Sequence, residues 1–104
     1  MTPSIPITKA LRLLQELRRV EPPMHSSEAE VLFLVARRPG ITQREAMIET
    51  GMSKSAISRH IEALGDREGR GYVVAREGLL DRRFHALHLT ETGAAFVRGL
   101  TAFL

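Results

Sequence analysis

Within residues 42–64, apolar side chains recur at helical spacing after a glycine turn. After the turn, Ile57, Ile61 and Leu64 follow one another at i, i+4 and i+7, which places them on one stripe of a helix. Gly51 is expected to end the preceding helix, because a residue without a Cβ atom enters the left-handed region without a steric penalty. The segment 42–64 therefore predicts a helix-turn-helix, two helices joined by a short turn.

Capping residues mark where these helices begin. Thr42 and Glu45 have the spacing of a capping box, in which each side chain accepts a hydrogen bond from the other residue's backbone N–H. Ser53 is the expected cap of the second helix. Ser27 and Glu30 repeat the capping-box spacing further toward the N-terminus, so we expect another helix to begin there.

Two helices are expected before the helix-turn-helix. After an irregular lead over residues 1–6, the segment 8–20 has Leu11, Leu14 and Leu17 on one face, and a pair of prolines ends it. The segment that follows Ser27 is apolar on nearly all sides. We therefore expect it to form the buried centre of the domain.

Two β-rich runs, 72–76 and 84–89, predict the strands of a hairpin. The glycine-rich segment 65–71 predicts a helix stop and a flexible turn, because the Gly-Lys-Ser/Thr sequence of a phosphate loop is absent. His85 and His88 would point to opposite faces of a strand, which makes them poor metal co-ligands. No metal site is expected.

The C-terminal segment 91–104 predicts an apolar helix that Thr90 caps. Only two of its residues are charged, so it would leave an exposed apolar patch on a lone domain of this size. A second copy related by two-fold symmetry is the simplest cover. We therefore expect a homodimer, with Phe96, Leu100 and Phe103 at its interface.

The polar side of the second helix in 42–64 carries the candidate functional residues. At about 100° per residue, Ser55, Arg59 and Glu62 project away from the apolar stripe, with Lys54 and Ser58 on the flanks. In a recognition helix such positions meet base edges and phosphates in the major groove of DNA, where an arginine pairs bidentately with guanine. An ordinary amphipathic helix with a solvated face fits this helix, taken alone, equally well.

Composition limits the remaining possibilities. The chain has 104 residues, the size of a single domain spanning 1–104, and it has no cysteine, which excludes disulfides, thiolate zinc sites and cysteine nucleophiles. It has no long apolar run and no signal-peptide pattern, so we expect a cytoplasmic protein. Basic residues outnumber acidic ones by four to one in 1–20 and by seven to five in 54–83, as a phosphate-binding surface requires. No catalytic constellation is recognisable, so we expect neither an enzyme nor a cofactor.

The sequence from about Pro39 to Leu100 resembles the MarR family of winged-helix transcriptional regulators. The resemblance rests on 42–51, on the MSKSAISRHIEAL segment that follows, on the Asp-Arg-Arg sequence at 81–83 and on LTETG at 89–93. It implies a mainly α fold with a small β-hairpin wing over 72–89, that is, a winged helix-turn-helix domain that binds double-stranded DNA.

The resemblance also implies roles for particular residues. Arg83 is similar to the family's wing arginine, directed toward the minor groove, and Asp81 to the acid that orients it. Helices 8–20 and 91–104 are implied to form the dimer, with Leu11 and Leu14 at the interface. The expected DNA contacts are Ser53, Lys54, Ser55, Ser58 and Arg59 on the recognition helix, Arg76, Asp81, Arg82 and Arg83 in the wing, and Thr42, Gln43 and Arg44 at the start of the first helix.

Some features depart from the family pattern. Thr50 and His60 stand where aliphatic residues are usual, the linker 65–71 is longer, and the C-terminal helical region is shorter. A small-molecule effector has precedent among relatives, but no residue pattern here supports one. The leading interpretation is a homodimeric repressor. One alternative is a DNA-binding protein of plasmid or phage replication or partition. The other is a winged helix that contacts only proteins, through Leu79 and Leu80 at the wing tip and through the C-terminal helix.

Overall fold

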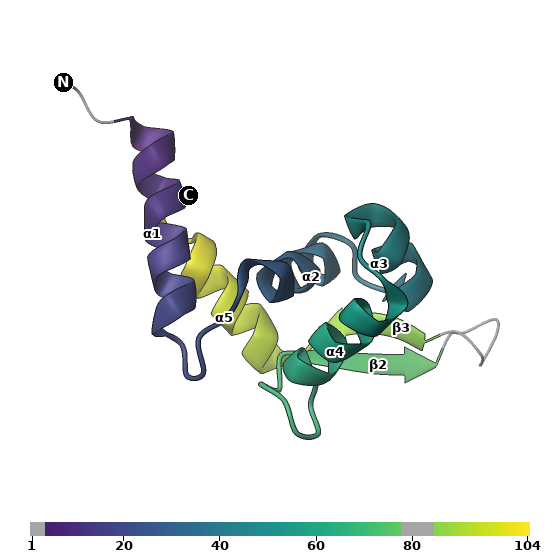
Figure 1. The fold of residues 1–104 in the computed structure, drawn as a ribbon. Coiled ribbons are helices and arrows are strands. Elements are labelled where there is room, and N and C mark those ends of the chain that lie inside the picture. Colours follow the sequence, from purple (N-terminus) through teal and green to yellow (C-terminus); the bar gives the residue numbers. More distant parts are fainter. Residues whose placement is uncertain (1–3, 78–84) are drawn as a thin grey trace.

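The computed structural model describes residues 4–77 and 85–104, and it arranges them as helices packed on a small sheet (Figure 1). The predicted mainly α architecture with a β-hairpin is confirmed. In chain order the elements are α1 (Ile5–Arg19), α2 (Ser26–Arg37), β1 (Ile41–Thr42), α3 (Gln43–Thr50), α4 (Lys54–Leu64), β2 (Val73–Glu77), β3 (His85–Leu89) and α5 (Glu91–Thr101).

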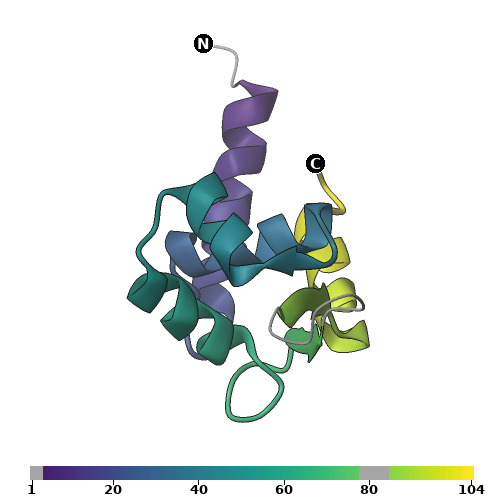
Figure 2. The ribbon, with the colours of Figure 1, turned by 90° about the vertical axis from the view of Figure 1, so that its right-hand side faces the viewer.

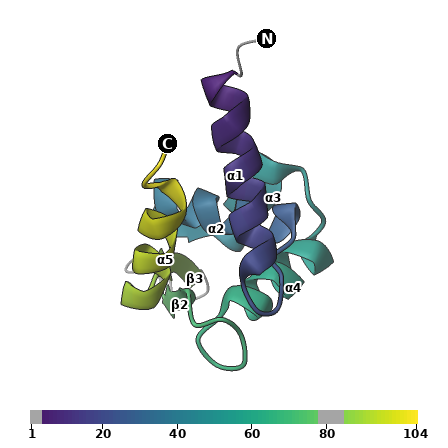
Figure 3. The same cartoon turned by 90° about the vertical axis from the view of Figure 1, so that its left-hand side faces the viewer.

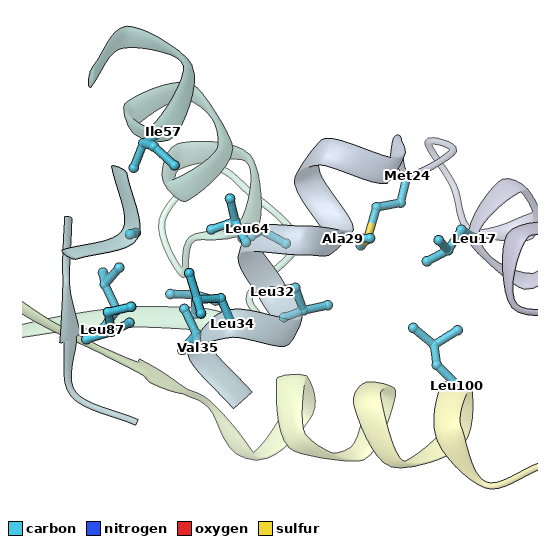
Figure 4. Packing of buried hydrophobic residues seen from close by; sticks show 14 residues of the cluster. Leu17, Met24, Ala29, Leu32, Leu34, Val35, Ile57, Leu64, Leu87 and Leu100 are labelled. Carbon is cyan, nitrogen blue, oxygen red and sulfur yellow. The ribbon is translucent and has the colours of Figure 1, made fainter. Parts of the chain in front are cut away.

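Helix α2 is the centre of the core, as its apolar sequence predicts. Val31, Leu32 and Val35 are fully buried. Side chains from α1, α4, β3 and α5 form one hydrophobic core with this helix (Figure 4). Burying an aliphatic side chain of this size contributes about 1.5–3 kcal/mol. The packing partners include Leu17 from α1, Ile57 and Leu64 from α4, Leu87 from β3 and Leu100 from α5.

The sheet has three antiparallel strands in the order β1-β3-β2. β3 is central, with Leu87 paired to Ile41 on one side and to Ala75 on the other. The Leu87 side chain packs in the hydrophobic core and is 2% exposed. The sequence predicts the β2–β3 hairpin but not β1, because a strand of two residues is too short to show an alternating pattern.

Helix α1 begins at Ile5, three residues before the predicted start at residue 8. Pro6 is accommodated because the first turn of a helix needs no backbone donor. Only Leu17 of the predicted apolar face is buried, and α1 extends beyond the rest of the molecule toward its N-terminal end (Figures 1 and 3). Leu11 and Leu14 are 54% and 55% exposed.

The capping box predicted for α2 is wrong. The helix begins at Ser26, with His25 as its N-cap residue, and no side chain caps it. Ser27 therefore lies inside the first turn rather than before it. Glu28, in the same turn, is buried and pairs with Arg70, which lies 42 residues further along the chain.

Among the described residues, no helix combines the length and the apolar character needed to cross a membrane.

Candidate nucleic-acid interface

Local hydrogen bonds hold the two helices of the helix-turn-helix as predicted. Thr42 Oγ1 accepts from the Glu45 N–H at 3.1 Å, and Glu45 Oε1 accepts from the Thr42 N–H at 3.1 Å, which completes the capping box. Gly51 ends α3 with φ of 74°, in the left-handed region. Ser53 Oγ accepts from the Ala56 N–H at 3.2 Å and caps α4. These interactions fix where both helices begin and where α3 ends.

Thr50 explains one departure from the family pattern. Its hydroxyl donates to the Ala46 carbonyl at 2.7 Å and accepts from the Met52 N–H at 3.1 Å. The side chain therefore satisfies backbone groups on both sides of Gly51, and a polar residue at this position stabilises the turn.

Helix α3 is tied to its neighbours by polar side chains. Gln43 Nε2 donates to Ser58 Oγ on α4 at 2.6 Å. Arg38, just after α2, pairs with both Glu45 and Glu49 on α3. The orientation of α3 therefore depends on contacts to Arg38 at the end of α2 as well as to α4.

Hydrogen bonds from the Thr42 backbone N–H and hydroxyl, with Arg38 nearby, lower the pKa of Glu45 from its ordinary value of 4.5.

Helix α4 presents one buried and one exposed side. Ile57 and Leu64 are fully buried and Ile61 is half-buried, so the predicted apolar stripe faces the core. The opposite side carries Lys54, Ser55, Arg59 and Glu62, which are all exposed. Figure 2 shows α4 at an outer edge of the molecule. We call Ser53, Lys54, Ser55, Ser58 and Arg59 the reading face.

Arg59 is available to an external partner. It is exposed, and within the described part of the chain its guanidinium makes no hydrogen bond or ion pair. Ser58 is half-buried, and its oxygen accepts from Gln43, which leaves the hydroxyl proton to donate elsewhere. Gln43 therefore orients a residue of the reading face in addition to lying near it.

The other expected DNA contacts are partly described. Arg76 is exposed on β2, opposite Ala86 of β3, and Arg44 is exposed on α3. The Thr42 hydroxyl is occupied by the capping box. Asp81, Arg82, Arg83, Leu79 and Leu80 lie outside the described residues.

The residues expected at a dimer interface occupy different environments. Leu11 and Leu14 are exposed on α1. Phe96 stacks on Tyr72 with ring centroids 4.5 Å apart, and the Arg12 guanidinium lies 4.3 Å from the centroid of the Phe103 ring. Leu100 is 5% exposed and belongs to the core of its own chain. The apolar surface open to a partner therefore lies mainly on α1.

Two open hollows flank Leu14 on α1. One, of about 400 Å³, lies against α2 and α3 and includes Leu13 and Phe33, and the other, of about 430 Å³, includes Leu11 and Met24. Both have mostly apolar walls. Among residues 4–77 and 85–104, no group of three or more acidic or histidine side chains is placed to hold a metal ion.

Sequence reasoning missed the role of Arg70. This residue lies in the linker 65–71, where the glycines indicated a flexible turn. Its Nε donates to Glu28 Oε2 at 2.6 Å. Glu28 is buried and Arg70 is largely covered, with side chains 8% and 10% exposed. The available signal was the position of Glu28, which lies at helical spacing from the apolar Val31, Leu32 and Val35. The capping-box interpretation of that turn did not consider it.

Comparison with known proteins identifies the family. A family model described as "MarR family" matches residues 21–83, which include the whole helix-turn-helix and strand β2. The chain belongs to the MarR family. Within that family it is similar to the transcriptional regulator PetP of Rhodobacter capsulatus, with 34% identity over 70 residues. That match spans 67% of this chain and 40% of the length of PetP.

Solved structures show the same winged-helix fold as this MarR-family chain. FabT of Streptococcus pneumoniae, crystallised in complex with DNA, has 20% identity and a TM-score of 0.75, over 94% of this chain and 68% of FabT. The transcriptional regulator PcaV of Streptomyces coelicolor, crystallised with its natural ligand, has 27% identity and a TM-score of 0.70. The match covers 93% of this chain and 66% of PcaV.

Proposed function

We propose that this chain is a sequence-specific regulator of transcription that binds double-stranded DNA as a homodimer, and that it represses by occluding a promoter. The observation that carries the proposal is the reading face: a helix whose apolar stripe is buried presents serine, lysine and an exposed arginine to solvent. MarR-family membership and the likeness to FabT, which was crystallised with DNA, support the same conclusion.

The reading face has the chemistry of a major-groove contact. Arg59 can donate two hydrogen bonds to guanine, which discriminates against other bases by about 1–3 kcal/mol. Lys54 and the serine hydroxyls suit phosphate oxygens, which position the helix without reading sequence. The N-terminus of α4 adds a partial positive charge beside them.

The proposed homodimer rests on helix α1. Ile7, Leu11 and Leu14 follow one another at i, i+4 and i+7 and are 70%, 54% and 55% exposed, so one face of α1 carries an exposed apolar stripe. The hollows on either side of Leu14 could receive apolar side chains from a second copy. A two-fold pair would also place two reading faces on one DNA duplex, about one helical turn apart.

A fluorescence anisotropy titration tests the DNA-binding proposal. The parent protein is titrated against random duplexes and against fragments enriched by selection from a random pool. We expect a clear preference for selected fragments, and Arg59→Ala should lose about 1–3 kcal/mol of that preference per guanine contact. Arg98→Ala, which removes an exposed arginine on α5, is the matched control and should retain the preference.

Two results would contradict this assignment. If the parent binds selected and random duplexes alike, the chain is not a sequence-specific reader. If it has a preference and Arg59→Ala keeps the preference in full, the reading face has been assigned to the wrong side of α4.

Sedimentation equilibrium tests the homodimer. We expect the parent to sediment at twice the chain mass of 11.6 kDa, and the double variant Leu11→Glu/Leu14→Glu to sediment as a monomer. Ile48→Glu is the control, because Ile48 is 73% exposed on α3, outside the proposed interface. A double variant with the same mass as the parent would show that α1 does not form the interface.

A further inference from the structure

The linker between α4 and β2 is held against the turn that joins α1 to α2. Arg70 Nε donates to Glu28 Oε2 at 2.6 Å, and Arg70 Nη2 donates to the Pro23 carbonyl at 3.2 Å. Glu28 lies in the first turn of α2, and Pro23 lies in the turn that precedes it. Figures 1 and 3 show the linker and the α1–α2 turn at the same end of the molecule. A single side chain therefore joins the linker to the segment that leaves α1.

The backbone around Arg70 holds the end of the recognition helix. The Arg70 N–H donates to the Ala63 carbonyl at 2.8 Å, and the Tyr72 N–H donates to the Leu64 carbonyl at 2.9 Å. Gly69 passes so close that a Cβ atom there would lie 2.4 Å from the Ala63 carbonyl oxygen. The linker is thus packed onto the last turn of α4.

The same short segment also holds the start of α5. Thr90 Oγ1 donates to the Gly71 carbonyl at 2.6 Å, and the Thr90 N–H donates to the Tyr72 carbonyl at 2.9 Å. A Cβ atom at Gly93 would lie 2.1 Å from the Tyr72 carbonyl oxygen, and the Tyr72 ring stacks on Phe96. Residues 70–72 therefore touch α4, α5 and the α1–α2 turn, and we call them the junction.

We propose that Arg70 and Glu28 are positioning residues that fix the angle between the recognition helix α4 and the helices α1 and α5, and so set the half-site spacing that the protein accepts. This inference rests on the proposed function, because spacing has meaning only for a dimer on DNA. The two residues lie at the end of α4 away from its reading face, so they act on DNA through the position of α4.

Half-site spacing is a sensitive readout of this angle. Consecutive base pairs are rotated by about 34–36°, so inserting two base pairs turns one half-site by about 70° relative to the other. A dimer with rigidly held recognition helices should reject such a site. A dimer whose recognition helices can tilt should tolerate it.

The experiment compares the parent with the double variant Glu28→Met/Arg70→Met. Removing both charges together avoids leaving one of them buried without a partner, and methionine adapts to the space. Anisotropy titrations use the duplex selected by the parent and versions with two base pairs inserted or deleted at its centre. Urea unfolding of each variant, measured in parallel, separates a change in position from a loss of stability.

We expect the parent to prefer its own spacing strongly, and the double variant to lose at least about fivefold of that preference, the lower end of coupling between distant sites. Arg98→Met is the matched control, because Arg98 is exposed on α5 and lines neither of the hollows beside Leu14. Its spacing preference should equal that of the parent. Glu28→Gln keeps an acceptor for Arg70 and should therefore lose less of the spacing preference than the double variant. It replaces the double variant in the experiment if the double variant does not fold.

The outcomes are distinguishable. A parent that has a spacing optimum, with variants that keep it in full while their stability changes, would overturn the positioning role and leave the proposed function standing. A parent that binds no duplex preferentially would overturn the proposed function, and this inference with it.

Discussion

Replacing Arg70 by methionine is expected to destabilise the fold strongly, because it leaves the Glu28 carboxylate buried without its partner. The two side chains are only 10% and 8% exposed, and their contact of 2.6 Å is within hydrogen-bond distance. Opposite charges about 4 Å apart attract by about 4 kcal/mol at an effective dielectric constant of about 20. An ion pair on the surface contributes only about 0–1 kcal/mol, so burial decides the size of the effect.

The magnitude follows from what remains around Glu28. Removing one partner of a buried pair costs about 3–5 kcal/mol. The partial positive charge at the N-terminus of α2 still stabilises the Glu28 carboxylate, by about 0.3–1 kcal/mol. We therefore expect Arg70→Met to lose about 3 kcal/mol of unfolding free energy. The double variant Glu28→Met/Arg70→Met should lie within about 1 kcal/mol of the parent, because no charge is left buried.

Urea unfolding followed by far-UV circular dichroism measures these values. All four proteins of the double-mutant cycle are compared at one protein concentration, because the stability of a dimer depends on concentration. An unchanged dependence of free energy on urea shows that the unfolded states are comparable. The reasoning is refuted if Arg70→Met loses less than about 1 kcal/mol of unfolding free energy, as expected for a surface pair. It is also refuted if the losses of Arg70→Met and Glu28→Met sum to that of the double variant within about 0.5 kcal/mol.

Further predictions concern the α5 packing, the capping box and the DNA contact. Gly93→Ala should lower the urea midpoint, because its Cβ atom would lie 2.1 Å from the Tyr72 carbonyl oxygen; an unchanged midpoint would contradict this close packing. The pKa of Glu45 is lowered in the folded state, chiefly by the Thr42 N–H, so its contribution to stability is present above pH 4.5 and is lost as the pH falls through the lowered value. Glu45→Gln should therefore flatten the loss of stability on acidification below pH 4.5, measured by urea unfolding across that range, and an equally steep loss would refute it. Lys54→Ala should reduce the slope of log affinity against log salt by about 1.8 if each subunit of a dimer loses one phosphate contact, while weakening binding to all duplexes alike. A slope equal to that of the parent would exclude a phosphate contact at Lys54.

Interactions between residues close in the chain could be predicted from the sequence. The Thr42 capping box, the left-handed Gly51 and the Ser53 cap involve residues only a few positions apart, and the structure confirms all three. The apolar stripe that ends at Leu64 also follows from helical periodicity alone. These features place the reading face on the outside of α4 before any tertiary contact is considered.

The same local rule was wrong at α2. Ser27 and Glu30 have the spacing of a capping box, but the helix begins one residue before Ser27. The first turn of α2 is held by the contact of Glu28 with Arg70, which the sequence pattern does not contain.

The amino-acid sequence by itself determined the helix-turn-helix, the side of α4 that faces solvent and the buried character of α2, because each depends on periodicity or on a cap within four residues. Only the tertiary structure decided which polar groups meet across the chain. The bonds from Gln43 to Ser58 and from Arg70 to Glu28 and Pro23 join residues 15, 42 and 47 positions apart. No periodicity specifies such pairs, because they form only when packing of the core brings distant segments within hydrogen-bond distance.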